Sequence, residues 1–303
     1  MPACIIFNPY AHRWLARKRQ PEVESALKAA GVEYRLCQTE APGHAEQLAQ
    51  NALQRGDSPI ISAGGDGTLN EVINGMLAAA GDAALPPVGI LPIGTANDLA
   101  FGLGYPTDVK RAAQQIAAAH VRPLDIAQAN ARYFINNAGV GLEPYITHLE
   151  DQITRVKGVA RYLLATLVGV WRCPRWEMTL TWENGGYRGP ITLVSVGNGR
   201  RTGGMFHLTP AACPDDGKLT ISMAFFGSRR ALLGVLPRAL TPGKFNVTHH
   251  PAVLQHHTAH LHILSNTPTL LQTDGRVEEK PVSEILFRLL PGRLPLLMDA
   301  SLL

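Results

Sequence analysis

The first third of the chain alternates short, largely apolar runs with longer segments in which apolar residues recur every three or four positions. Short apolar runs are typical of buried strands, and the longer period is typical of amphipathic helices. The expected strands are Ile5–Phe7, Glu33–Cys37, Ile60–Ala63 and Val88–Leu91, and the expected helices are Glu22–Ala30, His44–Gln54, Thr68–Ala80 and one that begins near Thr95. Strands that alternate with helices in this way predict a doubly wound α/β domain with a parallel sheet.

Beyond Asp125 the pattern changes to β-branched and aromatic runs separated by clusters of glycine, proline and asparagine. The clearest runs are Tyr133–Ile135, Met178–Leu180, Ile191–Val196 and Leu219–Met223. Such runs predict an antiparallel β-sandwich or barrel, here with one helical insertion around Gln152–Val170. We therefore expect one domain of residues 1–124 and a second of residues 125–303, with the last strand as a candidate to return to the first domain.

Composition supports two folded domains and excludes several classes of protein. The chain has 303 residues, about two domains of typical length, and 46% of them are hydrophobic, which excludes intrinsic disorder. Only 17% are charged, and the formal net charge is +4. Because nucleic-acid binders need a dense basic surface to neutralise phosphates, we expect no nucleic-acid partner.

The cysteines and the apolar runs bear on the location of the protein. The four cysteines form no Cys-x-x-Cys pair and are too sparse for a disulfide scaffold, so we expect reduced thiols in the cytoplasm. The first apolar run has no basic segment before it and is interpreted as a strand rather than a signal peptide. The longest apolar run, Tyr162–Trp171, is well short of the roughly 20 residues that cross a bilayer. Any membrane association should therefore be peripheral.

The segment Ile60–Val72 carries the strongest chemical signal. An apolar strand leads into three glycines within residues 64–67, and Thr68 with Glu71 has the spacing of a capping box, which predicts a helix start. Glycines let backbone N–H groups approach a ligand, and a helix N-terminus attracts phosphate. Asp66 would repel phosphate unless it holds Mg²⁺ or accepts a proton, a combination typical of phosphoryl transfer.

A second turn of the same kind follows the next strand. Residues 91–98 read Leu-Pro-Ile-Gly-Thr-Ala-Asn-Asp, and Thr95 with Asp98 again has capping spacing. The two helix starts should face one crevice at the carboxyl ends of the strands, where open α/β sheets bind ligands. The plainer alternative is that each turn serves only a sharp chain reversal, and the presence of two such turns argues against it.

Together, the motifs Gly64-Gly65-Asp66-Gly67-Thr68-x-x-Glu71-Val72 and Pro92-x-Gly94-Thr95-x-Asn97-Asp98 resemble the catalytic domain of the diacylglycerol kinase and sphingosine kinase superfamily, especially its bacterial lipid kinases. Further segments in family order extend the resemblance over nearly the full chain: Asn8-Pro9, Thr39, Pro42–Ala45, Asn137–Gly141, Gly197–Arg200 and Pro214–Leu219. The resemblance implies a Rossmann-like nucleotide domain, a β-sandwich second domain, ATP as phosphoryl donor and a lipid hydroxyl as acceptor. It also implies that the lipid substrate is met at a membrane surface, and it leaves a homodimer open.

The same resemblance implies binding residues for ATP and Mg²⁺. ATP would be held by Asn8, Thr39, Gly64, Gly65, Asp66, Gly67, Thr68, Leu69, Asn70 and Thr95, with Asp66 close to the transferred phosphate. For Asn8 and Thr39 the sequence alone shows only polar residues after strands, which serve a turn equally well. Magnesium would be held by Asp216 and the backbone carbonyls of Cys213 and Lys218, oxygen ligands that suit a hard cation. Residues Asp215-Asp216-Gly217 also suit a tight hairpin turn, and the two roles are compatible.

One departure from the family pattern concerns catalysis. The family closes its active site with Asp-Gly-Glu, whose acid accepts the proton of the lipid hydroxyl, whereas this chain reads Asp274-Gly275-Arg276. An arginine stays charged at physiological pH and cannot take a proton from an alcohol, although it can bind phosphate oxygens. Glu278, Glu279 or Asp66 would then have to replace the missing base. The expected catalytic set is Asp66, Asp274 and Arg276. A catalytically weak nucleotide- or lipid-binding regulatory protein is the alternative.

Three questions stay open at this stage. Six of the eleven histidines lie between His249 and His262, and with no cysteine or acidic residue among them we expect hydrogen-bonded or solvated side chains rather than a metal site. The segment Arg155–Arg175 mixes basic with aromatic and aliphatic residues, which suits either a core-packed helix or a helix lying on an anionic bilayer. An NAD kinase, which shares a Gly-Gly-Asp-Gly turn, is an alternative that the second glycine turn and the β-rich second half disfavour.

Overall fold

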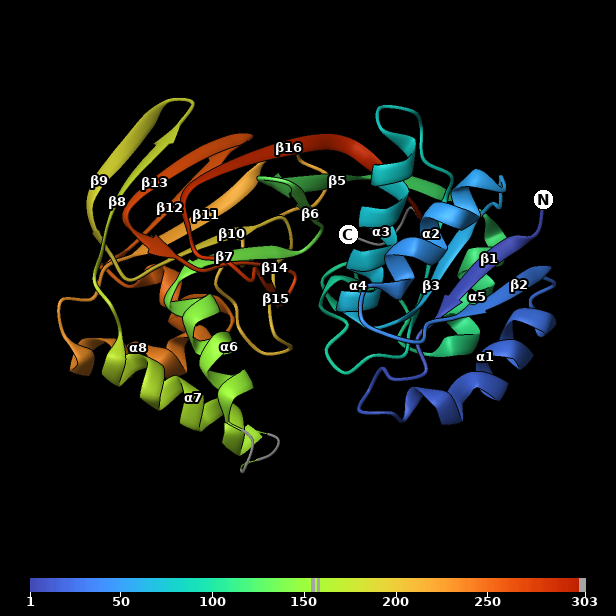
Figure 1. The fold of residues 1–303 in the computed structure, drawn as a ribbon, viewed down its shortest axis with the longest axis horizontal. Coiled ribbons are helices and arrows are strands. Elements are labelled where there is room, and N and C mark those ends of the chain that lie inside the picture. Colours follow the sequence, from blue (N-terminus) through green and yellow to red (C-terminus); the bar gives the residue numbers. More distant parts are fainter. Residues whose placement is uncertain (154–155, 157–158, 300–303) are drawn as a thin grey trace. The chain divides into compact units, whose positions relative to one another are not determined.

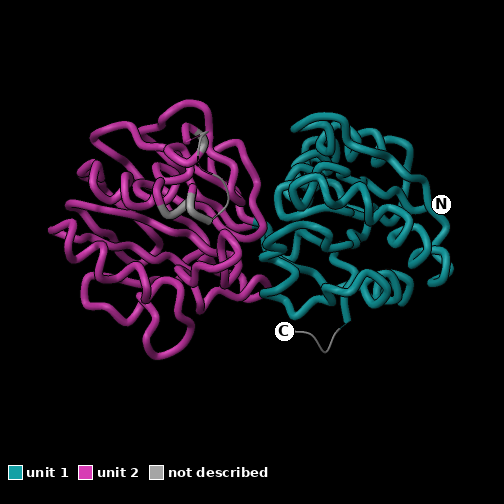
Figure 2. The backbone as a smooth tube through the Cα atoms, turned by 90° about the horizontal axis from the view of Figure 1, so that it is seen from below, with its two compact units in different colours: residues 1–126, 290–303 teal, residues 127–289 magenta. Residues whose placement is uncertain are grey.

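The computed structural model describes residues 1–153, 156 and 159–299. The chain forms two compact units, which Figure 2 shows in different colours. Unit 1 comprises Met1–Ile126 with Leu290–Leu303, and unit 2 comprises Ala127–Leu289. The division thus falls after residue 126, and the last segment of the chain belongs with the first unit.

Unit 1 is a parallel sheet with helices on both faces (Figure 1). Its strands β1 (Ala3–Phe7), β2 (Tyr34–Gln38), β3 (Ile60–Gly64) and β4 (Val88–Pro92) run parallel in the order β2-β1-β3-β4. Helices α2 (His44–Gln54) and α3 (Asp66–Ala80) pack together, as do α1 (Ala16–Ala29) and α5 (Val109–Ala118), and α4 (Asp98–Gly102) follows β4. Strands β1, β3 and β4 are buried along their whole length, as expected for a sheet covered on both faces. The predicted doubly wound α/β architecture is confirmed.

The starts of three helices differ from the predictions. Helix α1 begins at Ala16 rather than at Glu22 and contains Pro21. Helix α3 begins at Asp66 rather than Thr68, and α4 begins at Asp98 rather than near Thr95. Neither α3 nor α4 has a side-chain cap, so both predicted capping boxes are wrong.

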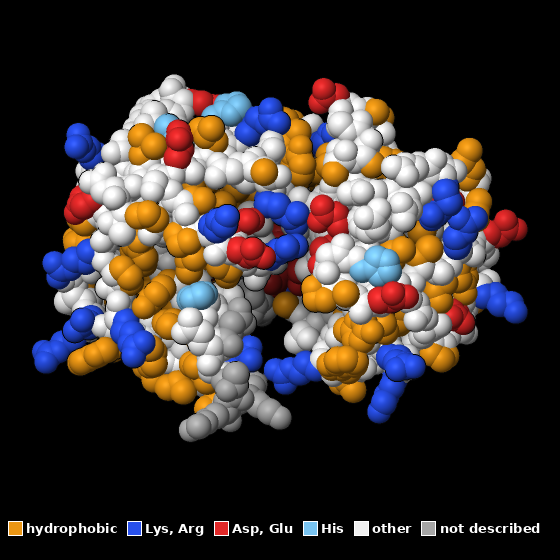
Figure 3. Space-filling model, in the orientation of Figure 1, with side chains coloured by type: hydrophobic (Ala, Val, Ile, Leu, Met, Phe, Trp, Pro, Cys, Tyr) orange, Lys and Arg blue, Asp and Glu red, His pale blue; other side chains and the backbone are white. Residues whose placement is uncertain are grey.

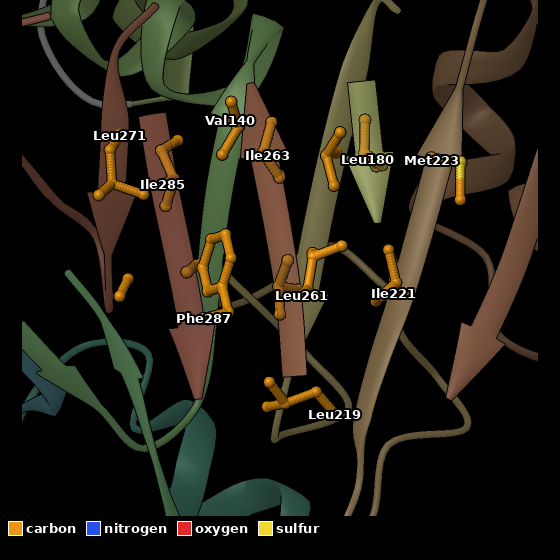
Figure 4. Packing of buried hydrophobic residues seen from close by; sticks show 14 of the residues in the cluster. Val140, Leu180, Leu219, Ile221, Met223, Leu261, Ile263, Leu271, Ile285 and Phe287 are labelled. Atoms are coloured by element: carbon orange, nitrogen blue, oxygen red, sulfur yellow. The ribbon is translucent and has the colours of Figure 1, made fainter. Parts of the chain in front are cut away.

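Unit 2 is an antiparallel β-sandwich, as predicted. One sheet contains β5 (Val121–Ala129), β6 (Arg132–Phe134), β8 (Trp176–Trp182), β9 (Gly185–Ile191), β13 (His260–Thr269) and β16 (Val282–Leu297). The other runs in the order β12 (Val253–Thr258), β11 (Leu219–Ala224), β10 (Leu193–Gly197), β7 (Asn137–Gly141), β14 (Leu271–Thr273) and β15 (Arg276–Val277). Figure 4 shows Val140, Ile221 and Met223 of the second sheet packed with Leu180, Leu261, Ile263 and Phe287 of the first.

Two details of unit 2 differ from the sequence expectation. The predicted single strand Ile191–Val196 is divided, because β9 ends at Ile191 and β10 begins at Leu193. Thr192 between them accepts a hydrogen bond from the Phe226 N–H through its hydroxyl, at 2.9 Å, so its side chain serves a loop instead of the sheet. The predicted helical insertion is a pair of helices, α6 (Leu142–Gln152) and α7 (Val159–Arg172), and the basic residues Arg155 and Lys157 lie outside the described residues.

Helices α6, α7 and α8 (Arg229–Ala239) share a second apolar core in unit 2. Short 3₁₀ turns at Gly243–Phe245 and Val247–His249 lead from α8 to β12. Among the described residues, no helix combines the length and apolar character needed to cross a membrane.

Candidate active site

A cleft of about 610 Å³ opens in unit 1 beside residues that directly follow β1, β2, β3 and β4. Its lining consists of Asn8, Tyr10, Ala11, His12, Trp14, Thr39, Glu40, Ala41, Pro42, Gly65, Gly67, Thr68, Glu71, Gly94 and Thr95. Both glycine turns therefore line one cleft, as their positions after neighbouring strands predict. The sequence reasoning missed Tyr10, His12, Trp14 and Glu40, which also line the cleft. These residues follow the ends of β1 and β2, and their position at the carboxyl ends of parallel strands could have predicted that they line a ligand site.

The two glycine turns touch each other through their backbones. A methyl group added at Gly94 would collide with the Cα of Gly65, and one added at Gly64 would collide with the side chain of Thr68. The Ile93 N–H also donates a hydrogen bond to the Gly64 carbonyl, at 3.0 Å. The glycines are therefore required for close packing of the turns, and the packing brings bare backbone to the cleft.

Thr68 and Glu71 bond to neighbouring segments instead of forming the predicted capping box. The Asn8 side-chain amide donates to the Thr68 hydroxyl at 2.9 Å, which joins the end of β1 to α3. The Glu71 carboxylate accepts the N–H groups of Gly43 and Ala45 at 2.9 and 3.3 Å. Glu71 thus caps the N-terminus of α2, the neighbouring helix, where a negative charge is favourable.

Asp66 is the first residue of α3 and is half-buried. Its Oδ1 accepts the Leu99 N–H at 3.3 Å, so the carboxylate ties the first glycine turn to α4. Asp66 lines a small crevice with Gly64, Leu69 and Asn97. Its negative charge lies at the positive end of the α3 dipole, which is a favourable position for it.

The other residues predicted to bind ATP divide into two groups. Thr39 and Thr95 line the cleft. Leu69 and Asn70 are buried within α3, where the Asn74 side-chain amide donates to the Asn70 carbonyl oxygen at 2.9 Å. Their side chains pack inside the unit.

Asp274 and Arg276 belong to unit 2 and differ in their surroundings. The Asp274 carboxylate accepts three backbone N–H groups, from Ile135, Asn136 and Asn137, at 2.9, 3.0 and 3.0 Å. It therefore holds the segment between β6 and β7 in place. Arg276 is exposed and lines a cavity of about 390 Å³ in unit 2. Arg132, Glu278, Glu279 and Lys280 line the same cavity.

Comparison with known proteins identifies the family. Residues 2–129 match the diacylglycerol kinase catalytic domain, and residues 136–298 match the YegS C-terminal NAD kinase beta sandwich-like domain. A diacylglycerol kinase of Staphylococcus haemolyticus (strain JCSC1435) is 32% identical over 277 residues, which cover 90% of this chain and 81% of that protein. The chain belongs to the diacylglycerol kinase family.

Other members of the diacylglycerol kinase family agree with this placement. The diacylglycerol kinase of Bacillus subtilis (strain 168) is 32% identical over 251 residues, covering 82% of this chain and 81% of that protein. A crystal structure of a Bacillus anthracis str. Sterne protein has a TM-score of 0.80 and 26% identity over 99% of this chain and 98% of the other. A second structure, of a diacylglycerol kinase from the same organism, shares the fold with a TM-score of 0.75 at 23% identity, covering 100% of this chain and 98% of that one.

The segment expected to hold Mg²⁺ in this kinase family member lies in the long connection between β10 and β11. Asp216 is exposed, and its Oδ1 accepts the Lys218 N–H at 2.9 Å, while its own N–H donates to the Cys213 carbonyl at 3.4 Å. With Gly217 at a φ of 72°, these bonds form a tight turn at the end of a long loop, not the short hairpin considered from the sequence. Carboxylate and carbonyl oxygens are ligands of the class that Mg²⁺ prefers, so the residue types fit a hard cation.

Glu143 is a half-buried acid with an enclosed carboxylate oxygen, and sequence reasoning missed it. It lies in the first turn of α6, where its Oε1 accepts the Gln272 side-chain amide at 2.6 Å, and the Ser195 hydroxyl also bonds to it. Its Oε2 is buried without a hydrogen-bond partner, and a methyl group at Gly139 would lie 2.7 Å from that oxygen. Burial raises the pKa of Glu143 from 4.5 to about 7, although the bonds from Gln272 and Ser195 act in the opposite direction.

The histidines of the second half have individual partners. His262 Nε2 lies 2.9 Å from Glu284 Oε1, and His257 Nδ1 lies 3.1 Å from the Thr220 hydroxyl. His256 stacks on Trp182 with ring centroids 4.4 Å apart. Among the described residues, no three His, Cys, Asp or Glu side chains are grouped as a metal site.

Proposed function

We propose that this protein is an ATP-dependent lipid kinase that transfers the γ-phosphoryl group to a lipid hydroxyl. The observation that carries the proposal is the backbone contact between Gly65 and Gly94 in one cleft beside the N-terminus of α3. Bare glycine backbone and a helix N-terminus offer N–H groups and a positive dipole to phosphate oxygens. Membership of the diacylglycerol kinase family supports a kinase that acts on a lipid.

In this proposal the chain's own groups position the reactants and move one proton. The acceptor hydroxyl loses its proton as its oxygen bonds to the γ-phosphorus, the bond between that phosphorus and its bridging oxygen to the β-phosphate breaks, and ADP leaves. Asp66 is the proposed proton acceptor, because Arg276 takes the place of the family's acid and Asp274 already accepts three backbone N–H groups. Mg²⁺ bound with the nucleotide would neutralise phosphate charge.

The lipid acceptor brings the protein to a membrane surface, and α7 offers the best candidate contact. Leu164, Leu167 and Trp171 are spaced for one face of that helix, with exposed fractions of 40%, 55% and 67%. Arg172 and Arg175 nearby are exposed as well. Figure 3 shows hydrophobic and basic side chains interspersed at lower left, over the region of α7 and α8 in Figure 1. Such a surface suits an anionic bilayer.

The test of the proposed activity is transfer of label from [γ-³²P]ATP in the presence of Mg²⁺. Mixed vesicles containing diacylglycerol, phosphatidylglycerol and a sphingoid base are offered in one set of reactions and NAD in another. We expect label in a lipid and none in NAD. Label in NAD alone would replace the lipid kinase with the NAD kinase alternative.

A second candidate function follows from Arg276. A member of the family that lacks the usual acid is suited to bind nucleotide or lipid with little turnover. If it has that role, Arg276→Glu should raise lipid phosphorylation at least about tenfold. If the wild-type protein is instead an active lipid kinase and Arg276→Glu lowers its turnover, then Arg276 contributes to catalysis or to substrate binding.

A further inference from the structure

The loop between β1 and α1 places two aromatic side chains at the cleft. Tyr10 and Trp14 meet edge to face, with ring centroids 4.6 Å apart and an interplanar angle of 85°. Both line the cleft that contains the two glycine turns, and Pro42 from the loop after β2 lines it as well. Tyr10 is 40% exposed and Trp14 is 66% exposed. Tyr10 and Trp14 therefore expose a large aromatic surface to solvent at the cleft.

The backbone of the loop that carries the aromatic pair has an unusual conformation. His12, Arg13 and Trp14 have φ angles of 51°, 54° and 73°, the left-handed region that residues with a Cβ seldom adopt. The Trp14 N–H donates to the Tyr10 carbonyl at 3.1 Å, and His12 Nδ1 lies 3.2 Å from the carbonyl oxygen of Gly94 in the second glycine turn. Backbone of this kind persists where surrounding structure enforces it, and it gathers at ligand-binding sites.

We propose that Tyr10 and Trp14 are the stacking platform for the purine base of the nucleotide, a specificity-determining role for this cleft. The inference rests on the proposed function, because the glycine turns hold the phosphates of the same molecule. Aromatic side chains bind the flat faces of nucleobases. The other walls carry the polar groups of Thr39, Glu40, Thr68 and Glu71. A cleft that combines exposed aromatic surface with polar groups fits a nucleotide.

The platform is tested by comparing ATP with inorganic tripolyphosphate, which carries the phosphates without a base. Binding of each to the full-length protein is measured by calorimetry with Mg²⁺, for wild type, Tyr10→Ala/Trp14→Ala and Trp14→Phe. Phe245→Ala removes a similarly exposed aromatic side chain from unit 2 and serves as the matched control, since Phe245 is 73% exposed. Thermal unfolding of each variant verifies that it is folded.

Wild type and Phe245→Ala should bind ATP at least about tenfold more tightly than tripolyphosphate. The double variant should lose most of this preference and Trp14→Phe should keep it, because phenylalanine retains an aromatic face. If the double variant is folded and still binds ATP more tightly than tripolyphosphate by the same factor as wild type, the platform is disproved while nucleotide binding stands. If wild type binds neither compound, the proposed function fails and the platform with it. Loss of vesicle binding with an unchanged ATP preference would assign the aromatic pair to the membrane and overturn the inference.

Discussion

Within the first glycine turn, Asp66 is the residue proposed to accept the proton in phosphoryl transfer. Its carboxylate lies at the start of α3 and accepts the Leu99 N–H. Asp66→Asn keeps the shape and one acceptor oxygen but removes the charge. Phosphoryl transfer should therefore fall at least about 100-fold, the lower range for loss of an acid–base group.

The measurement is initial-rate kinetics alongside thermal unfolding. Asp82→Asn, at an exposed position, is the control and should change neither the initial rate nor the melting temperature. If Asp66→Asn lowers the melting temperature and activity follows the folded fraction, Asp66 serves only to tie the turn to α4.

Gly94 provides a residue-scale prediction about stability. A methyl group there meets the Gly65 backbone, which has no side chain to move aside. Gly94→Ala should cost about 1 to 3 kcal/mol of unfolding free energy, as overpacking typically does. Gly67→Ala is the matched control within the same pair of turns, because a methyl group at Gly67 meets no atom within 4 Å. Chemical denaturation that ranks the two variants equally would contradict the backbone contact.

The sequence predicts local features of the site well and distant partners poorly. The glycine turns could be predicted because the strand, the glycines and the following helix are adjacent in the chain. The role of Glu71 could not, since its partner Gly43 is 28 residues away and immediately precedes another helix, α2. Asp274 is a stronger case, because it bonds to Ile135, 139 residues earlier, and no local pattern marks that pairing.

At the scale of elements, the sequence predicted the four parallel strands β1 to β4 of unit 1 but misplaced helix starts and gave no bounds for the returning strand β16. The positions of β1, β3 and β4 follow from burial on both faces, which selects largely apolar segments such as Ile60–Gly64. Helices α3 and α4 start two or three residues from the expected positions because backbone contacts at the turns, rather than side-chain caps, begin them. Thr192, between β9 and β10, instead uses its side-chain hydroxyl, which accepts a hydrogen bond from Phe226, 34 residues away.

Helix α6 gives a prediction about pH through Glu143. The pKa of Glu143 in the folded protein is about 7, above its ordinary value of 4.5, so the folded state binds the proton more tightly than the unfolded state. The stabilising effect of protonation is complete below pH 4.5 and is lost as pH rises through about 7. The free energy of unfolding should therefore fall by about 3 kcal/mol across this window.

Urea denaturation at several pH values measures this slope. Glu143→Gln cannot titrate and should flatten the profile between these limits, whatever its absolute stability. Glu183→Gln, an exposed acid of unit 2, should leave the wild-type slope in place. A wild-type slope in Glu143→Gln would assign the pH dependence to other groups.

For the whole molecule, the proposed membrane surface predicts a change in vesicle binding. Leu167→Glu together with Trp171→Glu removes two apolar side chains from the exposed face of α7 and puts two carboxylates in their place. The variant therefore loses apolar contact with the bilayer, and its new charges are repelled by anionic lipid. Binding to phosphatidylglycerol vesicles in a sedimentation assay should fall at least about tenfold. Leu286→Glu is the control, because Leu286 on β16 is 55% exposed, the same fraction as Leu167. Equal loss in both would mean that charge alone, at any position, weakens binding.

The return of β16 to unit 1 has a consequence for the order in which the protein can mature during synthesis. Leu296 pairs with Val88 of β4, and the Met298 N–H donates to the His120 carbonyl at 2.9 Å. A nascent chain that has released residues 1–126 from the ribosome still lacks the strand that covers this edge of its first sheet. Unit 1, although encoded first, is therefore completed last, after all of unit 2 has emerged.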